Sequence, residues 1–404
     1  MYLELFKNPL LLRLWLGQVL SAIGDRFFEI AIVWIAAETQ GAGAGFVLAT
    51  AVFSRLIFGL IGGIYADLWH KQRLMIASDL IRAIALFSIP IVAIFSDISI
   101  WQLIIVAIIE GASSAFFIPA MQASLPILAT DSKTLQSLNA LMDVSTRVAR
   151  IIGPGLAGLI LAFLPIIQFF TLDGFSFAIS ALIIFSLGHK HKWQVKVSKQ
   201  ISRTNPIAEL KTALVLLRRK PHVLYSLIAN GFTNIVWSMA MIVGLALFAK
   251  NNLAGSAATY GLVLSAYGVG NVVSNIIVGQ LEIRNRPRFL FWGYMTLGFG
   301  ILALAFASNL AMAAIAAALA AIGGPMGDLM LLMMIQEEFP ANAIAKIYSF
   351  RMTLASAGYS LGLVLAAVYF SFIPVMLGIA ICGLAYFLVG FLGALKYRKF
   401  VIKL

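Results

Sequence analysis

Long apolar runs alternate with short polar connections from one end of the chain to the other. Windows of about 20 apolar residues, the length that a membrane-spanning helix needs, fall into two sets of six. The first set lies near 10–36, 45–66, 74–95, 101–128, 138–163 and 166–187, and the second near 222–249, 257–281, 288–308, 309–335, 344–370 and 372–395. The short alternating strands of a transmembrane β-barrel do not occur in the sequence. The pattern predicts an all-α membrane protein with twelve transmembrane helices.

The two sets resemble each other in sequence. The stretch NPLLLRLWLGQVLS at 8–21 aligns with KPHVLYSLIANGFT at 220–233, and Gln122-x-x-x-Pro126 aligns with Gln336-x-x-x-Pro340. We therefore expect two parallel six-helix repeats, an architecture found in a transporter class whose substrate site lies between the repeats. The expected domains are an N-terminal bundle at 1–187, a basic cytoplasmic linker at 188–221 and a C-terminal bundle with a short basic tail at 222–404.

Composition and charge agree with this pattern. The chain of 404 residues is 61% hydrophobic and 11% charged, which is far too apolar for a soluble domain of this length. The net charge is +13, and the basic residues of the connections lie in the linker, the tail and the loops on one side, whereas the opposite connections hold only Lys250. This positive-inside distribution predicts a multi-pass protein of the cell (inner) membrane, with both termini cytoplasmic. The membrane orientation explains the basic net charge, so we expect no nucleic-acid partner.

Reactive chemistry is sparse in the sequence. There is one cysteine, and the four histidines lie in polar connections without the spacing of metal ligands. No nucleophile–base pair, phosphate-binding loop or metal cluster is visible, so we expect no catalytic residues, no metal, no cofactor and no enzymatic activity. The charges within the apolar runs cluster in one half instead of forming rings, which argues against a channel.

The end of the second run reads GLIGGIYADLWHKQR, from Gly59 to Arg73. Gly63-x-x-x-Asp67, followed by Lys71 and Arg73, places an acid at a helix end beside a basic tight loop. Such a group can form an ionic latch that gates the transporter, or it can be a plain helix end with anchoring charges. The stretch resembles the loop motif of the major facilitator superfamily, GxLaDrxGrk, although Leu68 and His70 replace its arginine and glycine.

A second motif lies in the fifth run, which contains RIIGPGLAG at 150–158. Pro154 can kink the helix, and Gly153 and Gly158 allow close helix packing. The stretch is similar to a shortened form of the superfamily's antiporter motif, GxxxGPxxGG.

Further stretches at 16–25, 116–128, 138–141 and 173–182 resemble the branch that contains macrolide-efflux proteins and the enterobactin exporter. That resemblance implies drug–proton antiport or siderophore export, and it implies that the first and fifth spans are neighbours. The pair Glu110-Gly111 departs from the Arg-Gly pair that many facilitators carry, so the usual arginine relay is not expected here.

Charged side chains interrupt the apolar runs near the middle of the membrane, judged by helical rise. An unpaired charge there costs about 2.5–3.5 kcal/mol on insertion scales. Two explanations stay open: a structural network of ion pairs, or at least one acid that gains and loses a proton during transport. The second gives the proton-coupling candidates Asp25, Glu29 and Glu110, with Arg26, Arg147 and Arg150 as counter-ions or contacts for an anionic substrate.

Other polar residues are expected to line a cavity. Gln18 continues the helix face of Asp25, and Asn230, Asn234 and Trp237 lie at i, i+4 and i+7 of the seventh span. Asp328 is the main acid within the second half. Interhelical hydrogen bonding is an equal explanation for the asparagines. Asp79 and Arg82, at i and i+3 near the inner side of the third span, are expected to act in gating or in the fold. Asp173 of the sixth span is expected to be structural, and Arg55 lies in the second span.

Together these features predict a monomeric secondary active transporter whose partners are a small-molecule substrate, protons and the bilayer. The expected activity is alternating-access export of a medium-sized amphipathic compound, such as a drug or a siderophore-like molecule, coupled to proton entry. Two alternatives remain: a siderophore importer or exporter for an anionic metal chelate, and a lipid-handling flippase of the same fold.

Overall fold

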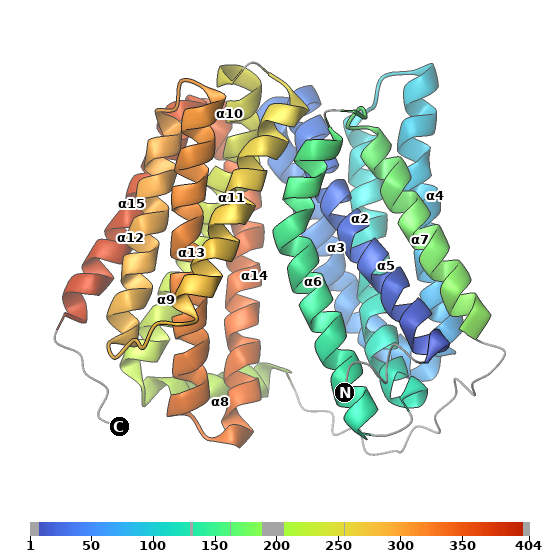
Figure 1. The fold of residues 1–404 in the computed structure, drawn as a ribbon, viewed down its shortest axis with the longest axis horizontal. Coiled ribbons are helices and arrows are strands. Elements are labelled where there is room, and N and C mark those ends of the chain that lie inside the picture. The colour runs from blue at the N-terminus through green and yellow to red at the C-terminus, as the bar shows by residue number, and fades with distance from the viewer. Residues whose placement is uncertain (1–7, 130–131, 162, 188–205, 254, 399–404) are drawn as a thin grey trace. The chain divides into compact units, whose positions relative to one another are not determined.

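The computed structural model describes residues 8–129, 132–161, 163–187, 206–253 and 255–398, and in these residues the regular structure is helical. It divides into two compact units, Met1–Gln40 with Phe46–Lys199, and Gly41–Gly45 with Gln200–Leu404. Each unit holds six long helical segments that run side by side (Figure 1). These segments correspond one to one with the predicted spans.

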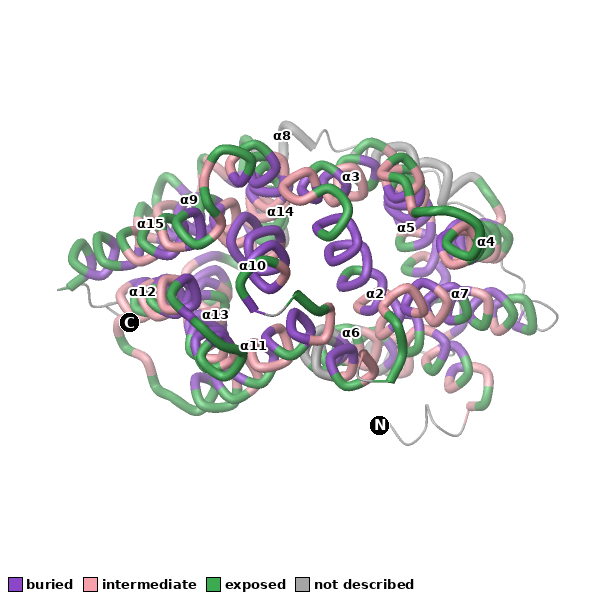
Figure 2. The backbone as a smooth tube through the Cα atoms, turned by 90° about the horizontal axis from the view of Figure 1, so that it is seen from above, coloured by how far each residue is buried: buried purple, intermediate pink, exposed green. Residues whose placement is uncertain are grey.

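The first unit contains six α-helices, of which four pairs make most of the contacts. Helix α7 packs against α2 and α4, while α5 packs against α4, and α6 against α2. Burial follows these contacts, since buried residues line the helix faces that meet and exposed residues line the outward faces (Figure 2). The helices are α2 (Pro9–Gln40), α3 (Ala44–Leu68), α4 (Lys71–Phe95), α5 (Ile100–Leu128), α6 (Ser132–Ile160) and α7 (Gln168–Leu187).

The second unit repeats the six-helix pattern with two features of its own. A short helix, α8, precedes the bundle, and the first long segment is split by a π-helical turn, Ser238–Gly244, which joins α9 to α10. The elements are α8 (Pro206–Arg218), α9 (Pro221–Trp237), α10 (Leu245–Asn252), α11 (Ala257–Val278), α12 (Arg286–Ala305), α13 (Leu310–Glu338), α14 (Ala341–Phe372) and α15 (Val375–Lys396).

The helices begin where the sequence supplies caps and prolines. Ser99 accepts a hydrogen bond from the backbone N–H of Gln102 at the start of α5, and Asn309 accepts one from Met312 at the start of α13. Pro221 occupies the first turn of α9, where its missing N–H costs nothing. Capping satisfies backbone groups that would otherwise be left without partners in an apolar medium.

Ten stretches of the described residues are long and apolar enough to cross a membrane. One of them, Pro9–Gly59, runs through both α2 and α3, while α6 is not among them. Helix α6 carries Asp143, Arg147 and Arg150, and these charges lower its hydropathy. Counting α2 and α3 separately and adding α6 brings the ten stretches to the twelve predicted helices.

Two features of the structure were not predicted from the sequence. Helix α8 lies within the stretch predicted as a linker at 188–221, and its apolar residues are too few to give a membrane-length run. The π-helical turn lies within the seventh span, predicted near 222–249. Turns of this kind are rare and often lie at functional sites.

Close helix packing in the second unit depends on glycines. A Cβ atom added at Gly383 of α15 would lie 2.5 Å from the backbone nitrogen of Leu302 in α12. Likewise, a Cβ at Gly298 of α12 would lie 2.3 Å from the backbone nitrogen of Phe387 in α15. The two backbones approach too closely for any side chain between them, as in small-residue interfaces of membrane helices.

The variant Gly383→Val is expected to lower the thermal unfolding temperature in detergent, because its side chain would force α12 and α15 apart. Overpacking of this kind costs about 1–3 kcal/mol. The matched control is Leu384→Val, one residue away on the exposed face of α15, which should unfold close to the wild-type temperature. Equal unfolding temperatures for Gly383→Val and the wild type would contradict the close packing.

Candidate functional site

The charges of α2 form an ion pair on the helix itself. Arg26 Nη1 lies 2.5 Å from Glu29 Oε2, and the Glu29 side chain is 55% exposed. The sequence had suggested that Glu29 meets arginines of the fifth span, but its partner among the described side chains is Arg26. Asp25 is half-buried, and it forms no ion pair within the described part of the chain.

Glu110 in α5 is paired with an arginine from another helix. Its Oε2 lies 3.3 Å from Nη2 of Arg55 in α3. The Glu110 side chain is 9% exposed and the Arg55 side chain 52%, so the arginine screens the acid from one side. The sequence places Arg55 in the second span. Its contact with Glu110 could not be predicted, because residue spacing does not show how α3 is rotated about its axis.

A third pair is fully buried in α4. Arg82 Nη2 donates to Asp79 Oδ1, and both side chains are almost entirely inaccessible. The Arg82 guanidinium lies 3.9 Å from the ring centre of Phe177 in α7 and 4.8 Å from that of Phe117 in α5. Two aromatic faces therefore replace water around the cation. The sequence suggested a role for this pair in gating or in the fold, and the aromatic enclosure was not visible in it.

Helix α6 lies against α2, so the first and fifth spans are neighbours, as the family resemblance implied. A Cβ atom at Gly153 would lie 2.6 Å from Cγ of Arg26, and this glycine therefore leaves room for the arginine stem. Gly158 is buried in the same helix. The side chains of Arg147, Arg150 and Pro154 lie outside the described residues, and their suggested roles stay predictions.

The proposed gate motif is described in part. Gly63 and Asp67 belong to α3, but their side chains lie outside the described residues. Lys71 is buried at the start of α4, whereas Arg73 is exposed. The latch between Asp67 and the basic loop stays a prediction.

Gln18 and the residues of α9 make hydrogen bonds between helices. Gln18 Nε2 donates to Ser180 Oγ of α7 at 3.2 Å. In the second unit, Asn230 Nδ2 donates to the Tyr294 hydroxyl at 3.3 Å, and Trp237 Nε1 donates to the Tyr267 hydroxyl at 3.2 Å. Asn234 Nδ2 donates to the backbone oxygen of Asn230 one turn earlier.

Aromatic rings and amides thus gather on one side of α9. The ring of Trp237 lies 6.1 Å from that of Tyr359 in α14 and 6.5 Å from that of Tyr267 in α11. Because the π-helical turn follows Trp237 directly, the helix changes its winding at the point where these rings meet. Tyr267 and Tyr359 were not predicted from the sequence. Only the residues of α9 show the helical spacing of i, i+4 and i+7 that marks one face.

Asp328 of α13 is paired with Arg351 of α14, with 2.7 Å between Oδ1 and Nη2. The aspartate side chain is 65% exposed and the arginine 12%. Helix α13 continues to Glu338, so Asp328 lies about 15 Å from the helix end by helical rise. Arg351 was not singled out in the sequence.

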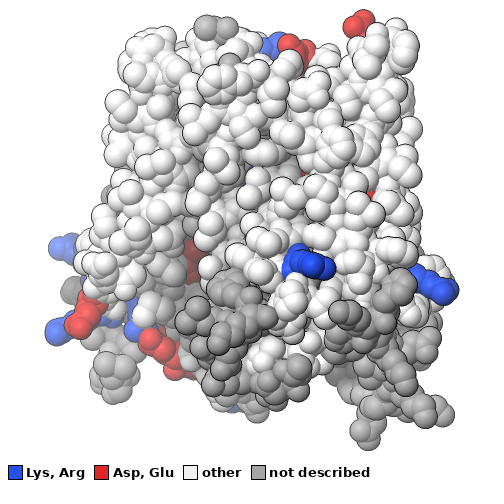
Figure 3. Space-filling model, turned by 45° about the vertical axis from the view of Figure 1, so that its right-hand side comes forward, with Lys and Arg blue, Asp and Glu red and all other residues white. Residues whose placement is uncertain are grey.

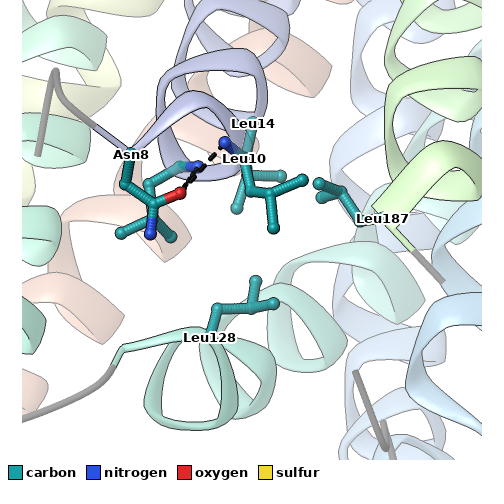
Figure 4. Close-up of a pocket in the computed structure, with 6 residues that line it drawn as sticks. Asn8, Leu10, Leu14, Leu128 and Leu187 are labelled. Atoms are coloured by element: carbon teal, nitrogen blue, oxygen red, sulfur yellow. Dashed lines mark hydrogen bonds between the residues drawn. The ribbon is translucent and has the colours of Figure 1, made fainter. Parts of the chain in front are cut away.

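Most of the described surface in Figure 3 carries neither acidic nor basic side chains. A small gap in the first unit is lined by Asn8, Leu10, Leu11, Leu14, Leu128 and Leu187 (Figure 4). Its one polar side chain, Asn8, accepts a hydrogen bond from the backbone of Leu10. Within the described residues, no group of three or more His, Cys, Asp or Glu side chains could hold a metal ion.

The sequence and the fold are similar to those of known transporters. Residues 3–396 match the family described as transmembrane secretion effector. The chain is 23% identical to an uncharacterized MFS-type transporter of Bacillus subtilis, over 96% of this chain and 93% of that protein. It is 20% identical to macrolide efflux protein A of Streptococcus pyogenes, with 88% of each covered. The crystal structure of nucleoside transporter NupG shares the fold, with a TM-score of 0.69 at 14% identity over 97% of this chain and 100% of that chain.

The buried pair in α4 can be tested by a double-mutant cycle. Arg82→Gln leaves Asp79 charged and unpaired, and breaking a buried pair in this way costs about 3–5 kcal/mol. The double variant Asp79→Asn/Arg82→Gln removes both charges and is expected to be more stable than Arg82→Gln alone. Thermal unfolding in detergent measures all four proteins, and additive effects would show that the two residues do not interact.

Proposed function

The chain belongs to the transmembrane secretion effector family of the major facilitator superfamily, and from that premise we propose that it exports a medium-sized amphipathic compound in exchange for protons. Its place in the family makes it a multi-pass membrane transporter of small molecules. Export, proton coupling and the class of substrate are the proposal. The distribution of basic residues supports an inner-membrane location with both termini in the cytoplasm.

The observation that carries proton coupling is the set of acids inside the first bundle. Each charge within the hydrocarbon region costs about 2.5–3.5 kcal/mol unless it is paired or hydrated. Arg26, Arg55 and Arg82 each pair with one acid. Asp25 has no such partner among the described side chains. Ionisable groups kept within membrane helices at this cost are functional candidates by default.

The three coupling candidates have different roles in this proposal. Asp25 binds the proton directly, because it forms no ion pair among the described residues. Glu29 and Glu110 are each held by an arginine, and they take up a proton only when a change of conformation separates the pair. One proton that enters along a potential of 100 mV supplies about 2.3 kcal/mol. That energy can sustain a gradient of exported compound.

Two observations support an amphipathic substrate. A relative that matches nearly nine tenths of the chain is named for macrolide efflux. In the second bundle, Trp237, Tyr267 and Tyr359 bring rings together beside Asn230 and Asn234. Such a surface offers both stacking and hydrogen bonding. An anionic chelate of the siderophore type is the second candidate, and it is favoured by Arg55, whose side chain remains half exposed beside Glu110.

The test is transport by purified protein in liposomes with an imposed inward proton gradient. Internal pH is followed while erythromycin, tetraphenylphosphonium or enterobactin is added. We expect erythromycin to evoke proton flux in the wild type. Asp25→Asn should abolish this flux, and Glu29→Gln should reduce it, because each removes an acid that binds the proton.

The matched control is Asp97→Asn, which removes an exposed acid in the connection between α4 and α5 and should leave flux unchanged. Flux evoked by enterobactin alone would assign the substrate to the anionic chelates. Erythromycin binding without proton flux in the wild type would contradict proton coupling, and unchanged flux in Asp25→Asn would contradict its role.

A further inference from the structure

Asp173 of α7 is a buried acid that the mechanism above does not use. Its side chain is fully inaccessible, and Oδ1 accepts a hydrogen bond of 3.0 Å from Ser176 one turn along the helix. Its Oδ2 is buried and has no hydrogen-bond partner among the described residues. A carboxylate oxygen without a donor is costly in an apolar interior, so this group needs an explanation beyond packing.

The acid lies directly against the backbone of α2. A Cβ atom at Gly24 would lie 2.3 Å from Oδ1 of Asp173 and 2.7 Å from Oγ of Ser176. A larger residue at this position would force the side chains of Asp173 and Ser176 to move. The next residue in the chain is Asp25. Two carboxyl groups on neighbouring helices are thereby brought to the same level of the bundle.

Two contacts fix the register between α2 and α7. The rings of Phe27 and Phe169 stack with their centres 4.8 Å apart. Gln18 donates to Ser180 about two turns nearer the start of α2. The proximity of Asp173 to the segment Gly24-Asp25 therefore depends on packed contacts on both sides along the helices.

Within the described residues, neither of these two acids belongs to an ion pair. The elements around them carry three pairs: Arg26 with Glu29 on α2, Asp79 with Arg82 on α4, and Arg55 of α3 with Glu110 of α5. Helix α6, which packs against α2, also carries Asp143, Arg147 and Arg150, whose side chains lie outside the described residues. Arg26 and Arg82 act electrostatically on Asp25. Asp25, Arg82 and Glu110 act electrostatically on Asp173.

Two carboxyl groups that interact across a medium of low permittivity do not ionise independently. A proton on either carboxyl group removes the repulsion between them. A proton on Asp173 Oδ2 would also neutralise the buried oxygen that has no hydrogen-bond partner among the described residues. The proton can pass from the carboxylic acid of one residue to the carboxylate of the other, so that one negative charge moves the opposite way and no other reactant is needed.

We propose that Asp173 and Asp25 share one transferable proton, and that Asp173 holds it within the first bundle while Asp25 exchanges it with the transport pathway. The role of this shared proton in transport rests on the proposed function, which is proton-coupled export. Asp173 then acts as a proton carrier, whereas the sequence had suggested a structural role.

Infrared difference spectroscopy on the full-length protein in lipid vesicles tests the shared proton without any substrate. Acidification should produce the C=O stretching band of a protonated carboxylic acid in a dry environment. We expect Asp173→Asn to lose this band, and Asp25→Asn to shift the pH at which the band develops. Asp97→Asn, which alters an exposed acid, should keep the wild-type band.

A second variant covers the case in which Asp173→Asn does not fold. Ser176→Ala keeps the acid but removes the hydrogen bond to Oδ1, so the band should remain and change its frequency. An unchanged band in folded Asp173→Asn, or an unchanged frequency in Ser176→Ala, would overturn the proposal. A purely structural role for Asp173 would produce neither spectral change.

The same variants separate this proposal from the proposed function. If the band behaves as expected while the wild type shows no substrate-evoked proton flux in liposomes, the shared proton stands and proton-coupled export is wrong. If flux is present and the Asp173→Asn band is unchanged, export stands and the shared proton is wrong.

Discussion

Every charge that the first bundle keeps inside its apolar helices must be neutralised, hydrated or protonated, and this requirement organises the bundle. The free energy of leaving one charge bare in hydrocarbon is a sizeable part of the net stability of a typical domain. Arg82 satisfies the requirement by lying between two aromatic rings and binding Asp79. Arg26 and Arg55 satisfy it by binding Glu29 and Glu110, with part of each pair exposed. These three pairs differ in burial, and the two more exposed ones can open at a lower cost than the pair in α4.

The second bundle has a different character. Within its described residues, Asp328 of α13 and Arg351 of α14 bind each other, and the aspartate side chain is largely exposed. The other polar groups are amides and tyrosine hydroxyls that hydrogen-bond between helices. We therefore propose that the first bundle binds protons and that the second contacts the transported compound. The π-helical turn begins directly after Trp237, whose ring belongs to the ring cluster.

The spans were predictable because a membrane helix must satisfy its backbone internally and bury apolar side chains along about 20 residues. That constraint acts on every residue of a span, so the signal is strong. Partners of the charged residues were not predictable, because they depend on the rotation of each helix and on which helices touch. Spacing placed Asp25 and Glu29 on one face, but it could not show that Arg26 would bind Glu29 or that Arg55 would reach Glu110. Similarly, the sequence does not show that Gly24 packs against the side chain of Asp173. Helix α8 and the π-helical turn were missed because neither changes the hydropathy of its segment enough to be seen.

The central claim is that movement of the compound is tied energetically to movement of protons. The most direct test is a reversal measurement in proteoliposomes, with radiolabelled erythromycin on both sides and the proton gradient varied. Coupled exchange predicts that net erythromycin flux stops at a concentration ratio that shifts in proportion to the imposed proton gradient. If net flux stops at equal erythromycin concentrations whatever the proton gradient, the compound moves uncoupled and the account is contradicted.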